Sequence, residues 1–202
     1  ALDLIVSAIK KSGFINGKDV SICLDVAANE LYKNKKYSIH SKSYISVDKS
    51  IKEYQKIIKK YKIKSIEDPF GENDWIAWNK LMKSIKKVQI VGDDLYVTNL
   101  ERLKTGFLNI SSNSILIKLN QIGTVSETLD VIKFAQTIGY KTIISHRSGD
   151  SEDTFIADLA VGTNSNQIKT GSLARSERVA KYNQLIRIEE ELGKKARMNK
   201  IN

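Results

Sequence analysis

The sequence predicts an α/β fold in which short strands of a parallel sheet alternate with helices. Short apolar runs and stretches with helical spacing follow one another along nearly the whole chain, as about six strand–helix units. Each predicted strand ends in a polar or charged residue, and parallel folds bind their ligands at this edge of the sheet. A chain of 202 residues, 41% of them hydrophobic, is long enough for one domain with a sizeable core.

The first half of the chain opens with a helix, because apolar residues follow helical spacing from Leu2 to Ile9. The run VSICLD predicts a strand that ends at Asp25, and the stretch after it predicts a hairpin that turns at Asn34 and Lys35. The elements that follow are a helix at 49–61 capped by Asp48, a strand that ends at Glu67, a helix that begins at Asn73 or Asp74, a strand that ends at Asp93 and a helix at 100–106.

The second half predicts the remaining units with clearer boundaries. Thr124 and Glu127, three residues apart, indicate a capping box at the start of a helix. No low-complexity segment or linker interrupts the chain, so we assign residues 1–193 to one domain and 194–202 to a polar tail. The predicted elements are strands that end at Lys118, His146 and Lys169, and helices at 124–138, 152–160 and 174–193.

Composition excludes several classes of function. The net charge of +10 comes from 33 Lys and Arg against 23 Asp and Glu, and the excess lysine is spread along helical stretches at 51–62 and 80–87. Aromatic residues do not alternate with it, so we interpret these charges as solvated helix faces and expect no nucleic-acid partner. No apolar run approaches the ~20 residues of a membrane span. The single cysteine, Cys23, and two histidines exclude a disulfide framework and a four-ligand zinc site, and they fit a cytoplasmic location.

Three of the predicted strands end in carboxylates, at Asp25, Glu67 and Asp93. Because the carboxyl ends of parallel strands meet at one edge of a sheet, we expect these side chains around one pocket. A few carboxylates that leave room for water and substrate oxygens favour Mg²⁺. For each acid taken alone, a helix N-cap or a loop salt bridge is the alternative, and Asp68 and Asp94 are candidate supporting or capping neighbours.

The other three strands end in basic residues, at Lys118, His146 and Lys169. A lysine held near a divalent cation and a second lysine can act as a general base, so Lys118 is a candidate proton acceptor. The alternative is a lysine whose charged end simply reaches solvent. Arg147 and Ser148 follow the histidine, and an arginine can hold a phosphate or carboxylate through two N–H groups while a serine adds a hydroxyl donor. This combination indicates proton abstraction next to a carboxylate.

Longer stretches of the chain resemble the enolase family. The run ILIKLNQIGTVSET is similar to the enolase signature. The runs SIEDPF, VGDDLYVTN, SHRSGDSEDTFIADLAVG and QIKTGSLARSERVAKYNQLIRIEEELG are similar to its other motifs, in the family's order and near its spacing. ALDLIVSAIKKSG and LDVAANELY also fit, so the resemblance covers nearly the whole chain. It implies the C-terminal part of an enolase-type TIM-like barrel, incomplete without upstream strands and an N-terminal domain.

The resemblance implies a glycolytic lyase, a phosphopyruvate hydratase that reversibly dehydrates 2-phosphoglycerate to phosphoenolpyruvate with Mg²⁺. It implies that Lys118 accepts the proton from C2, and that Arg147 and Ser148 hold the phosphate while a second Mg²⁺ arrives with the substrate. Lys169 would then face the substrate carboxylate and His146 the reacting end. The implied ligands of the tighter Mg²⁺ are Asp25, Glu67 and Asp93, of which Glu67 and Asp93 also border the substrate.

The family's general-acid glutamate and its lid loops belong to a part that precedes the present Ala1, and a helix that begins at the first residue indicates a piece of a longer protein. We therefore expect these 202 residues alone to be poorly stable and essentially inactive. Asn29 stands where many members have Ser, which we expect to be tolerated.

The resemblance implies that the complete protein is a cytoplasmic homodimer. One alternative is a truncated, non-catalytic enolase-like protein that binds partners such as plasminogen, secreted or at the cell surface. Another is an enolase-superfamily enzyme that acts on a sugar acid, which the HRSG motif disfavours.

Overall fold

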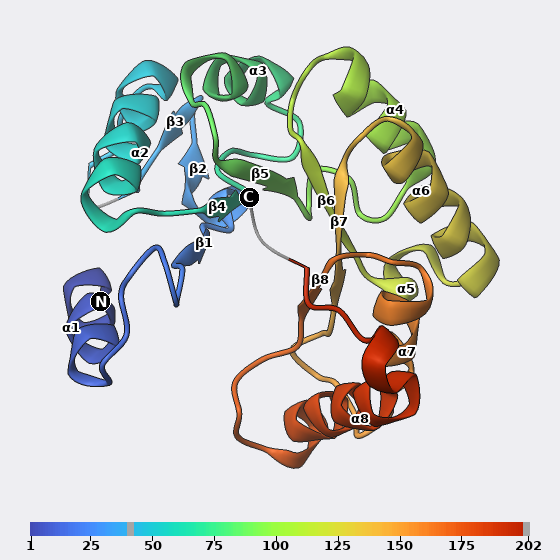
Figure 1. Cartoon of the computed structure of the whole chain (residues 1–202). Helices are drawn as coiled ribbons and strands as arrows, with labels where there is room; N and C mark the ends of the chain where they lie inside the picture. The colour runs from blue at the N-terminus through green and yellow to red at the C-terminus, as the bar shows by residue number, and fades with distance from the viewer. Residues whose placement is uncertain (40–42, 200–202) are drawn as a thin grey trace. The chain divides into compact units, whose positions relative to one another are not determined.

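The computed structural model of the protein describes residues 1–39 and 43–199, and the chain packs as two compact units built of strands and helices (Figure 1). Unit 1 comprises Ala1–Tyr96 and Lys104–Asn113, and unit 2 comprises Val97–Leu103 and Ser114–Asn202. Within the described part of the chain, no helix is both long and apolar enough to cross a membrane.

Unit 1 is centred on three parallel strands, with β4 between β1 and β5. Asp25 lies opposite Glu67, and Glu67 lies opposite Val91, so the three strands run to the same edge. Strands β4 and β5 are buried throughout, as is usual for parallel strands covered on both faces. The elements of this unit are α1 (Leu2–Lys11), β1 (Cys23–Asp25), η1 (Ala28–Leu31), β2 (Tyr32–Lys33), β3 (Lys36–Tyr37), α2 (Val47–Tyr61), β4 (Ser65–Glu67), α3 (Trp75–Ser84), β5 (Gln89–Gly92) and the second part of α4 (Leu100–Leu108).

The predicted hairpin is confirmed. Strands β2 and β3 pair antiparallel, with Lys33 opposite Lys36. Asn34 and Lys35 between them have φ angles of 51° and 58°. Two consecutive positive φ angles are what a two-residue type I′ turn requires.

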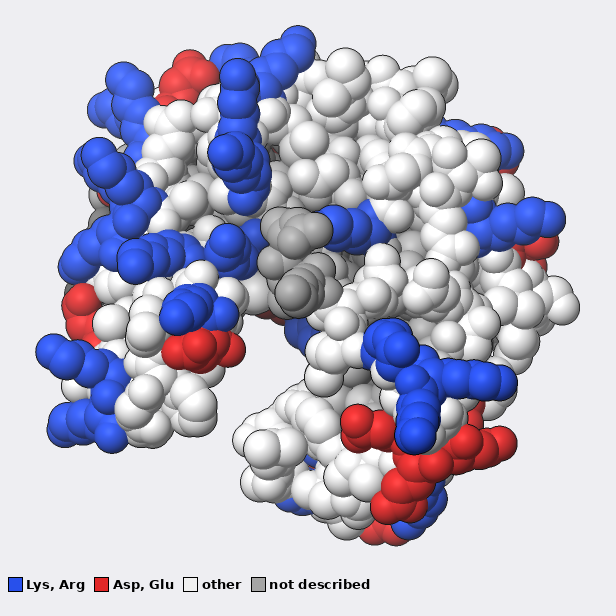
Figure 2. All heavy atoms as spheres, in the orientation of Figure 1, with Lys and Arg blue, Asp and Glu red and all other residues white. Residues whose placement is uncertain are grey.

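The helix α2 begins two residues earlier than predicted, and its cap is Ser46 rather than Asp48. The Ser46 hydroxyl accepts a hydrogen bond from the Lys49 amide at 3.4 Å. Asp48 lies instead in the first turn, where a carboxylate is favourable, and its side chain pairs with Lys80 of α3 at 2.9 Å. Lysine side chains along α2 stand out into solvent (Figure 2), which agrees with a solvated helix face.

An aromatic cluster holds the loop that follows β4. The rings of Tyr37 and Tyr54 meet the Phe70 ring edge-on, at centroid distances of 5.0 and 5.8 Å. The Tyr37 hydroxyl accepts a hydrogen bond from the Gly71 amide at 3.0 Å and donates one to Asp74 at 2.9 Å. Asp74, one of the two residues predicted to begin this helix, is the N-cap of α3, so one buried hydroxyl joins the loop to the start of the helix.

Unit 2 is centred on three further parallel strands, with β7 between β6 and β8. Helix α6 packs on β6 and β7, and α7 packs on β7, β8 and α8. The elements of this unit are the first part of α4, β6 (Ser114–Ile117), α5 (Leu119–Ile122), α6 (Val125–Thr137), β7 (Lys141–Ser145), α7 (Phe155–Gly162), β8 (Gln167–Lys169), α8 (Ser176–Leu192) and η2 (Gly193–Lys195).

Several boundaries differ from the predictions. Strands β5, β6 and β7 end one residue earlier, so Asp93, Lys118 and His146 are the first residues of the following loops. Helix α7 begins at Phe155 rather than at Glu152, because the preceding residues form a loop tied to α8. Helix α8 begins two residues later than predicted.

The predicted cap of α6 is confirmed, since the Thr124 hydroxyl accepts a hydrogen bond from the Glu127 amide at 3.2 Å. In the predicted capping box, however, the Glu127 carboxylate would bond the Thr124 backbone amide. It bonds the Thr124 hydroxyl at 2.5 Å instead.

The predicted α/β class is confirmed, with strands that alternate with helices along both units. Residues 194–199 of the predicted tail begin with the short helix η2, and residues 200–202 lie outside the described residues. The assignment of 1–193 to one domain stays a prediction.

Replacing Tyr37 by Phe will lower the free energy of unfolding by about 1–3 kcal/mol, because the buried Gly71 amide loses its acceptor. Urea unfolding of the two proteins measures this difference. Tyr32→Phe is the matched control, since the Tyr32 ring lies 4.9 Å from the Tyr37 ring but is 41% exposed. Equal effects of the two substitutions would contradict the role given to the Tyr37 hydroxyl.

Candidate active site

The three carboxylates predicted to bind metal come from adjacent strands of unit 1. Asp25 pairs directly with Glu67, and Asp93 lies two residues beyond Val91, which is the partner of Glu67 on β5. Asp25 is exposed, whereas Glu67 and Asp93 are buried. The fold therefore brings the predicted ligands to one edge of the sheet.

The turn after β5 is fixed by a fourth carboxylate, Asp68. Its two oxygens accept hydrogen bonds from the backbone amides of Asp93 and Asp94, at 2.9 and 2.8 Å. Its own amide donates to the Val91 carbonyl at 3.0 Å. Burial raises the pKa of Asp68 to about 8, although the two backbone N–H groups act in the opposite direction. The Asp68 side chain therefore fixes the backbone from which the Asp93 side chain extends.

Oxygens of Asp68, Asp93 and Asp94 all lie within 4.8 Å of one another, so this cluster is also a possible cation site. It shares only Asp93 with the predicted ligand set. Because both Asp68 oxygens already accept backbone hydrogen bonds, we interpret Asp68 as a support of the turn rather than a ligand. Asp25, Glu67 and Asp93 stay the predicted ligands.

Asn29 joins two loops beside these carboxylates. Its amide nitrogen donates to Asp94 at 2.9 Å and to the Glu72 carboxylate at 3.2 Å. Its oxygen accepts a hydrogen bond from the Glu72 amide at 2.9 Å. A serine has a single hydroxyl and cannot make all three hydrogen bonds, so Asn29 makes more contacts than the serine of many family members could make at this position.

In unit 2, a buried threonine holds the backbone of Lys118 at the end of β6. The Lys118 amide donates to the Thr98 hydroxyl at 2.9 Å, and that hydroxyl donates to Gln121 at 2.7 Å. Thr98 and the preceding Val97 have φ angles of 54° and 44°, a region that β-branched residues rarely adopt. The loop before α4 is thus held in an uncommon conformation where it supports the predicted base.

His146 begins the loop that follows β7, and it lies next to the end of β8. Its amide donates to the Lys169 carbonyl at 2.9 Å. Arg147 and Ser148 are both exposed, and the Arg147 guanidinium donates to Asn120 at 2.8 Å. Burial and then the charge of Arg178 lower the pKa of His146 below its ordinary value.

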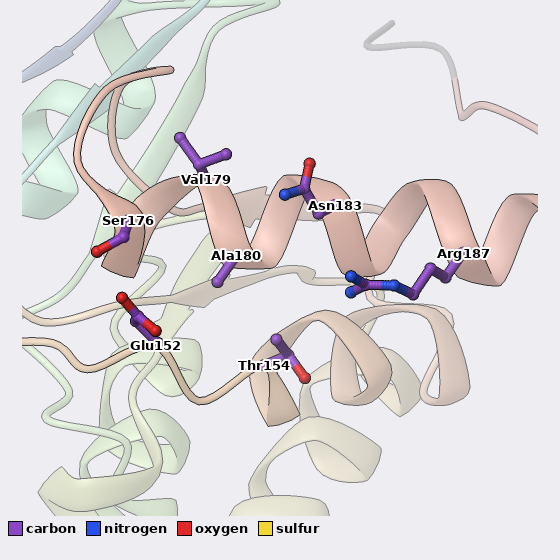
Figure 3. Close-up of a pocket in the computed structure, with 7 residues that line it drawn as sticks. All are labelled: Glu152, Thr154, Ser176, Val179, Ala180, Asn183 and Arg187. Carbon is purple, nitrogen blue, oxygen red and sulfur yellow. The ribbon is translucent and has the colours of Figure 1, made fainter.

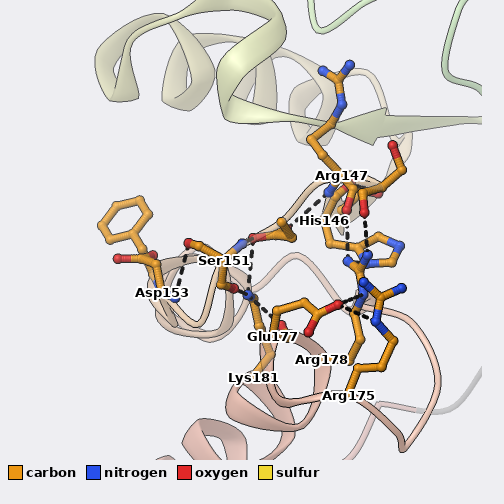
Figure 4. Close-up of polar contacts among 12 residues, drawn as sticks. His146, Arg147, Ser151, Asp153, Arg175, Glu177, Arg178 and Lys181 are labelled. Carbon is orange, nitrogen blue, oxygen red and sulfur yellow. Dashed lines mark hydrogen bonds and ion pairs between the residues drawn. The ribbon is translucent and has the colours of Figure 1, made fainter.

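Helix α8 supports this loop with a lysine that has no exposed surface (Figure 4). The Lys181 ammonium donates to the Asp150 carboxylate at 3.1 Å, to the Glu177 carbonyl at 2.7 Å and to the Ser151 carbonyl. Asp150 in turn accepts the Arg147 amide at 3.1 Å. Although burial opposes it, these hydrogen bonds hold the pKa of Asp150 below its ordinary value.

A separate hollow of about 360 Å³ lies between the start of α7 and α8 (Figure 3). Its lining includes Glu152, Thr154, Asn183 and Arg187 and none of the predicted site residues. This hollow is therefore separate from the predicted site residues, which lie at or after the strand ends of each unit.

The whole chain matches a known family, described as the enolase C-terminal TIM barrel domain, over residues 1–202. The chain belongs to this family. It is also 87% identical, over 202 residues, to the enolase of Pelagibacter ubique (strain HTCC1062). That match covers 100% of the chain and 48% of the relative, so the chain spans about half the length of the curated relative that it matches.

The match confirms the resemblance to the enolase family and the interpretation of the six parallel strands as part of a TIM barrel. Three supporting residues were missed by the sequence analysis, namely Thr98, Arg178 and Lys181. The only signal for the last two is their spacing, because residues three apart lie on one face of a helix.

Gly171 packs where an alanine would not fit, next to the supported loop. Its φ is +87°, and an added Cβ would lie 2.7 Å from Arg178 Cδ and 3.2 Å from His146 Cε1. Gly123 has a φ of +104° with nothing within 4 Å, so Gly123→Ala measures the backbone cost alone, about 1–2 kcal/mol. Gly171→Ala will lower the free energy of unfolding by about 1–3 kcal/mol more than Gly123→Ala does, because the added methyl group overpacks the site. Equal losses in urea unfolding would contradict this packing.

Proposed function

We propose that this chain supplies the metal-binding carboxylates and the general base of a phosphopyruvate hydratase, which interconverts 2-phosphoglycerate and phosphoenolpyruvate. The observation that carries the proposal is the family match over residues 1–202, together with 87% identity to a curated enolase. The residues that we assign to this reaction lie at the ends of strands in the two units or shortly after them.

The carboxylates of unit 1 suit Mg²⁺. They are hard oxygen donors from neighbouring strands, and the oxygen of one of them, Asp93, lies within 4.8 Å of two further carboxylates. We propose Asp25, Glu67 and Asp93 as the residues that hold the ion. When bound, Mg²⁺ would neutralise negative charge on the substrate carboxylate, which makes the neighbouring carbon easier to deprotonate.

Lys118 is the proposed general base. Its neutral amine would take the proton from C2 of 2-phosphoglycerate, and the C–H electrons would then form the C2–C3 double bond as the C3 hydroxyl leaves as water. The Thr98 hydroxyl fixes the backbone of Lys118, so the base is held at the end of β6. The group that protonates the leaving hydroxyl is not assigned to a residue of this chain.

The loop after β7 is the proposed phosphate site. Arg147 offers a planar guanidinium and Ser148 a hydroxyl, both exposed, and these groups suit a phosphate. We propose that Lys169 faces the substrate carboxylate and that His146 lies close to the reacting end. We further propose that the complete protein acts in the cytoplasm as a homodimer.

In the complete gene product, Lys118→Ala will lower kcat for 2-phosphoglycerate by about 10²–10⁴-fold, because no other group takes the C2 proton. Exchange of that proton with deuterated water, followed by NMR, will be lost in parallel. Lys133→Ala, on the exposed face of α6, is the control and should retain both.

Undiminished exchange in Lys118→Ala would show that another residue is the base. If the wild-type gene product neither turns over 2-phosphoglycerate nor exchanges its C2 proton in the presence of Mg²⁺, the enzyme proposal fails. The non-catalytic alternative then takes its place.

A further inference from the structure

Helix α8 presents a second buried cation to the loop after β7. The Arg178 side chain is 8% exposed, and its guanidinium donates to the carbonyls of Arg147 and Ser148, both at 2.8 Å. It also contacts the Nδ1 atom of His146 (Figure 4). One arginine thus bonds three consecutive residues of the proposed phosphate and reaction site.

The contact with His146 determines where the imidazole carries its proton. A guanidinium has only donors, so the Nδ1 atom of His146 can only accept in this hydrogen bond. An Nδ1 that accepts carries no proton. The neutral ring therefore holds its proton at Nε2 and presents a donor there.

The surroundings of this pair prevent an easy rearrangement. Gly171 closes one side, where even a methyl group would meet both Arg178 and His146. Lys181, one turn along α8, fixes Asp150 and Ser151 of the same loop. The loop and the ring are therefore held from the helix at several points.

We propose that Arg178 is a positioning residue that fixes His146 as the neutral Nε2–H tautomer, so that His146 acts as a hydrogen-bond donor toward the reacting end. The donor role toward substrate rests on the proposed function. The tautomer does not, because it follows from the contacts of Arg178 within unit 2.

The charges around the ring agree with this assignment. Burial and Arg178 lower the pKa of His146, and Lys169 at the end of β8 and Lys118 at the end of β6 act in the same direction. Asp150 in the same loop opposes them. Because the folded-state pKa is lowered, the ring is neutral above its ordinary pKa of 6.5 and resists protonation below it.

Nitrogen-15 NMR of histidine-labelled gene product tests the proposal directly, with the His146 signals identified by their absence in His146→Gln. In the wild type, the shifts should show an unprotonated, hydrogen-bonded Nδ1 and a protonated Nε2, with a titration midpoint below 6.5. In Arg178→Met, both tautomers should be populated, and the midpoint should move up toward 6.5. Arg187→Met, on the same helix and exposed, should leave the His146 signals unchanged.

A proton on Nδ1 in the wild type, or an unchanged tautomer and midpoint in Arg178→Met, would overturn the proposal. If Arg178→Met does not fold, Arg178→Lys replaces it, since its ammonium keeps the charge but offers its donors from a single nitrogen and should give an intermediate spectrum. The wild-type spectrum decides the tautomer by itself.

Kinetics separate this inference from the proposed function. Arg178→Lys should lower kcat/KM for 2-phosphoglycerate by up to about 100-fold through misplacement of the loop, with the His146 midpoint shifted in the same protein. If the wild type turns over 2-phosphoglycerate but the His146 spectrum is unchanged in both Arg178→Met and Arg178→Lys, the inference is wrong and the proposed function stands. A wild type without turnover refutes the proposed function, while its spectrum still decides the tautomer.

Discussion

A buried ammonium keeps its charge only if its N–H groups meet acceptors, and the arrangement of the predicted phosphate loop depends on this constraint. Lys181 has no exposed surface, and its contacts are Asp150, the Glu177 carbonyl and the Ser151 carbonyl. Loss of one of these partners would leave the buried charge poorly compensated and would lower the free energy of unfolding by about 3–5 kcal/mol. These hydrogen bonds hold the loop in a conformation in which its backbone contacts α8. In this conformation, Arg147 and Ser148 are exposed.

In unit 1, a buried aspartate holds a loop in a similar way. Asp68 is buried and accepts two backbone amides, and by doing so it orders the turn that carries Asp93 and Asp94. In both units, a buried ionisable side chain outside the proposed reaction holds the backbone of residues inside it. Such supports allow an exposed residue such as Arg147, whose amide donates to Asp150, to keep one backbone geometry.

The sequence predicted what depends on local pattern. The spacing of apolar residues located the ends of the six parallel strands to within one residue, and the Asn34–Lys35 turn followed from its position between two short strands. Asp48 was misassigned because Ser46 and Asp48 are both good caps, and in the structure Ser46 caps the helix while Asp48 pairs with Lys80 of α3. Lys181 could not be predicted, because in the sequence it resembles any helical lysine, and its partners Asp150 and Ser151 lie about 30 residues away.

The most direct test concerns the metal. Crystals of the complete gene product grown with Mn²⁺, which prefers the same oxygen ligands as Mg²⁺, would locate the ion by its anomalous scattering. We predict an ion about 2.1 Å from oxygens of Asp25, Glu67 and Asp93, with Asp68 still bonded to the amides of the following turn. An ion held by Asp68 and Asp94 instead, or no bound ion at all, would contradict the assignment of the site.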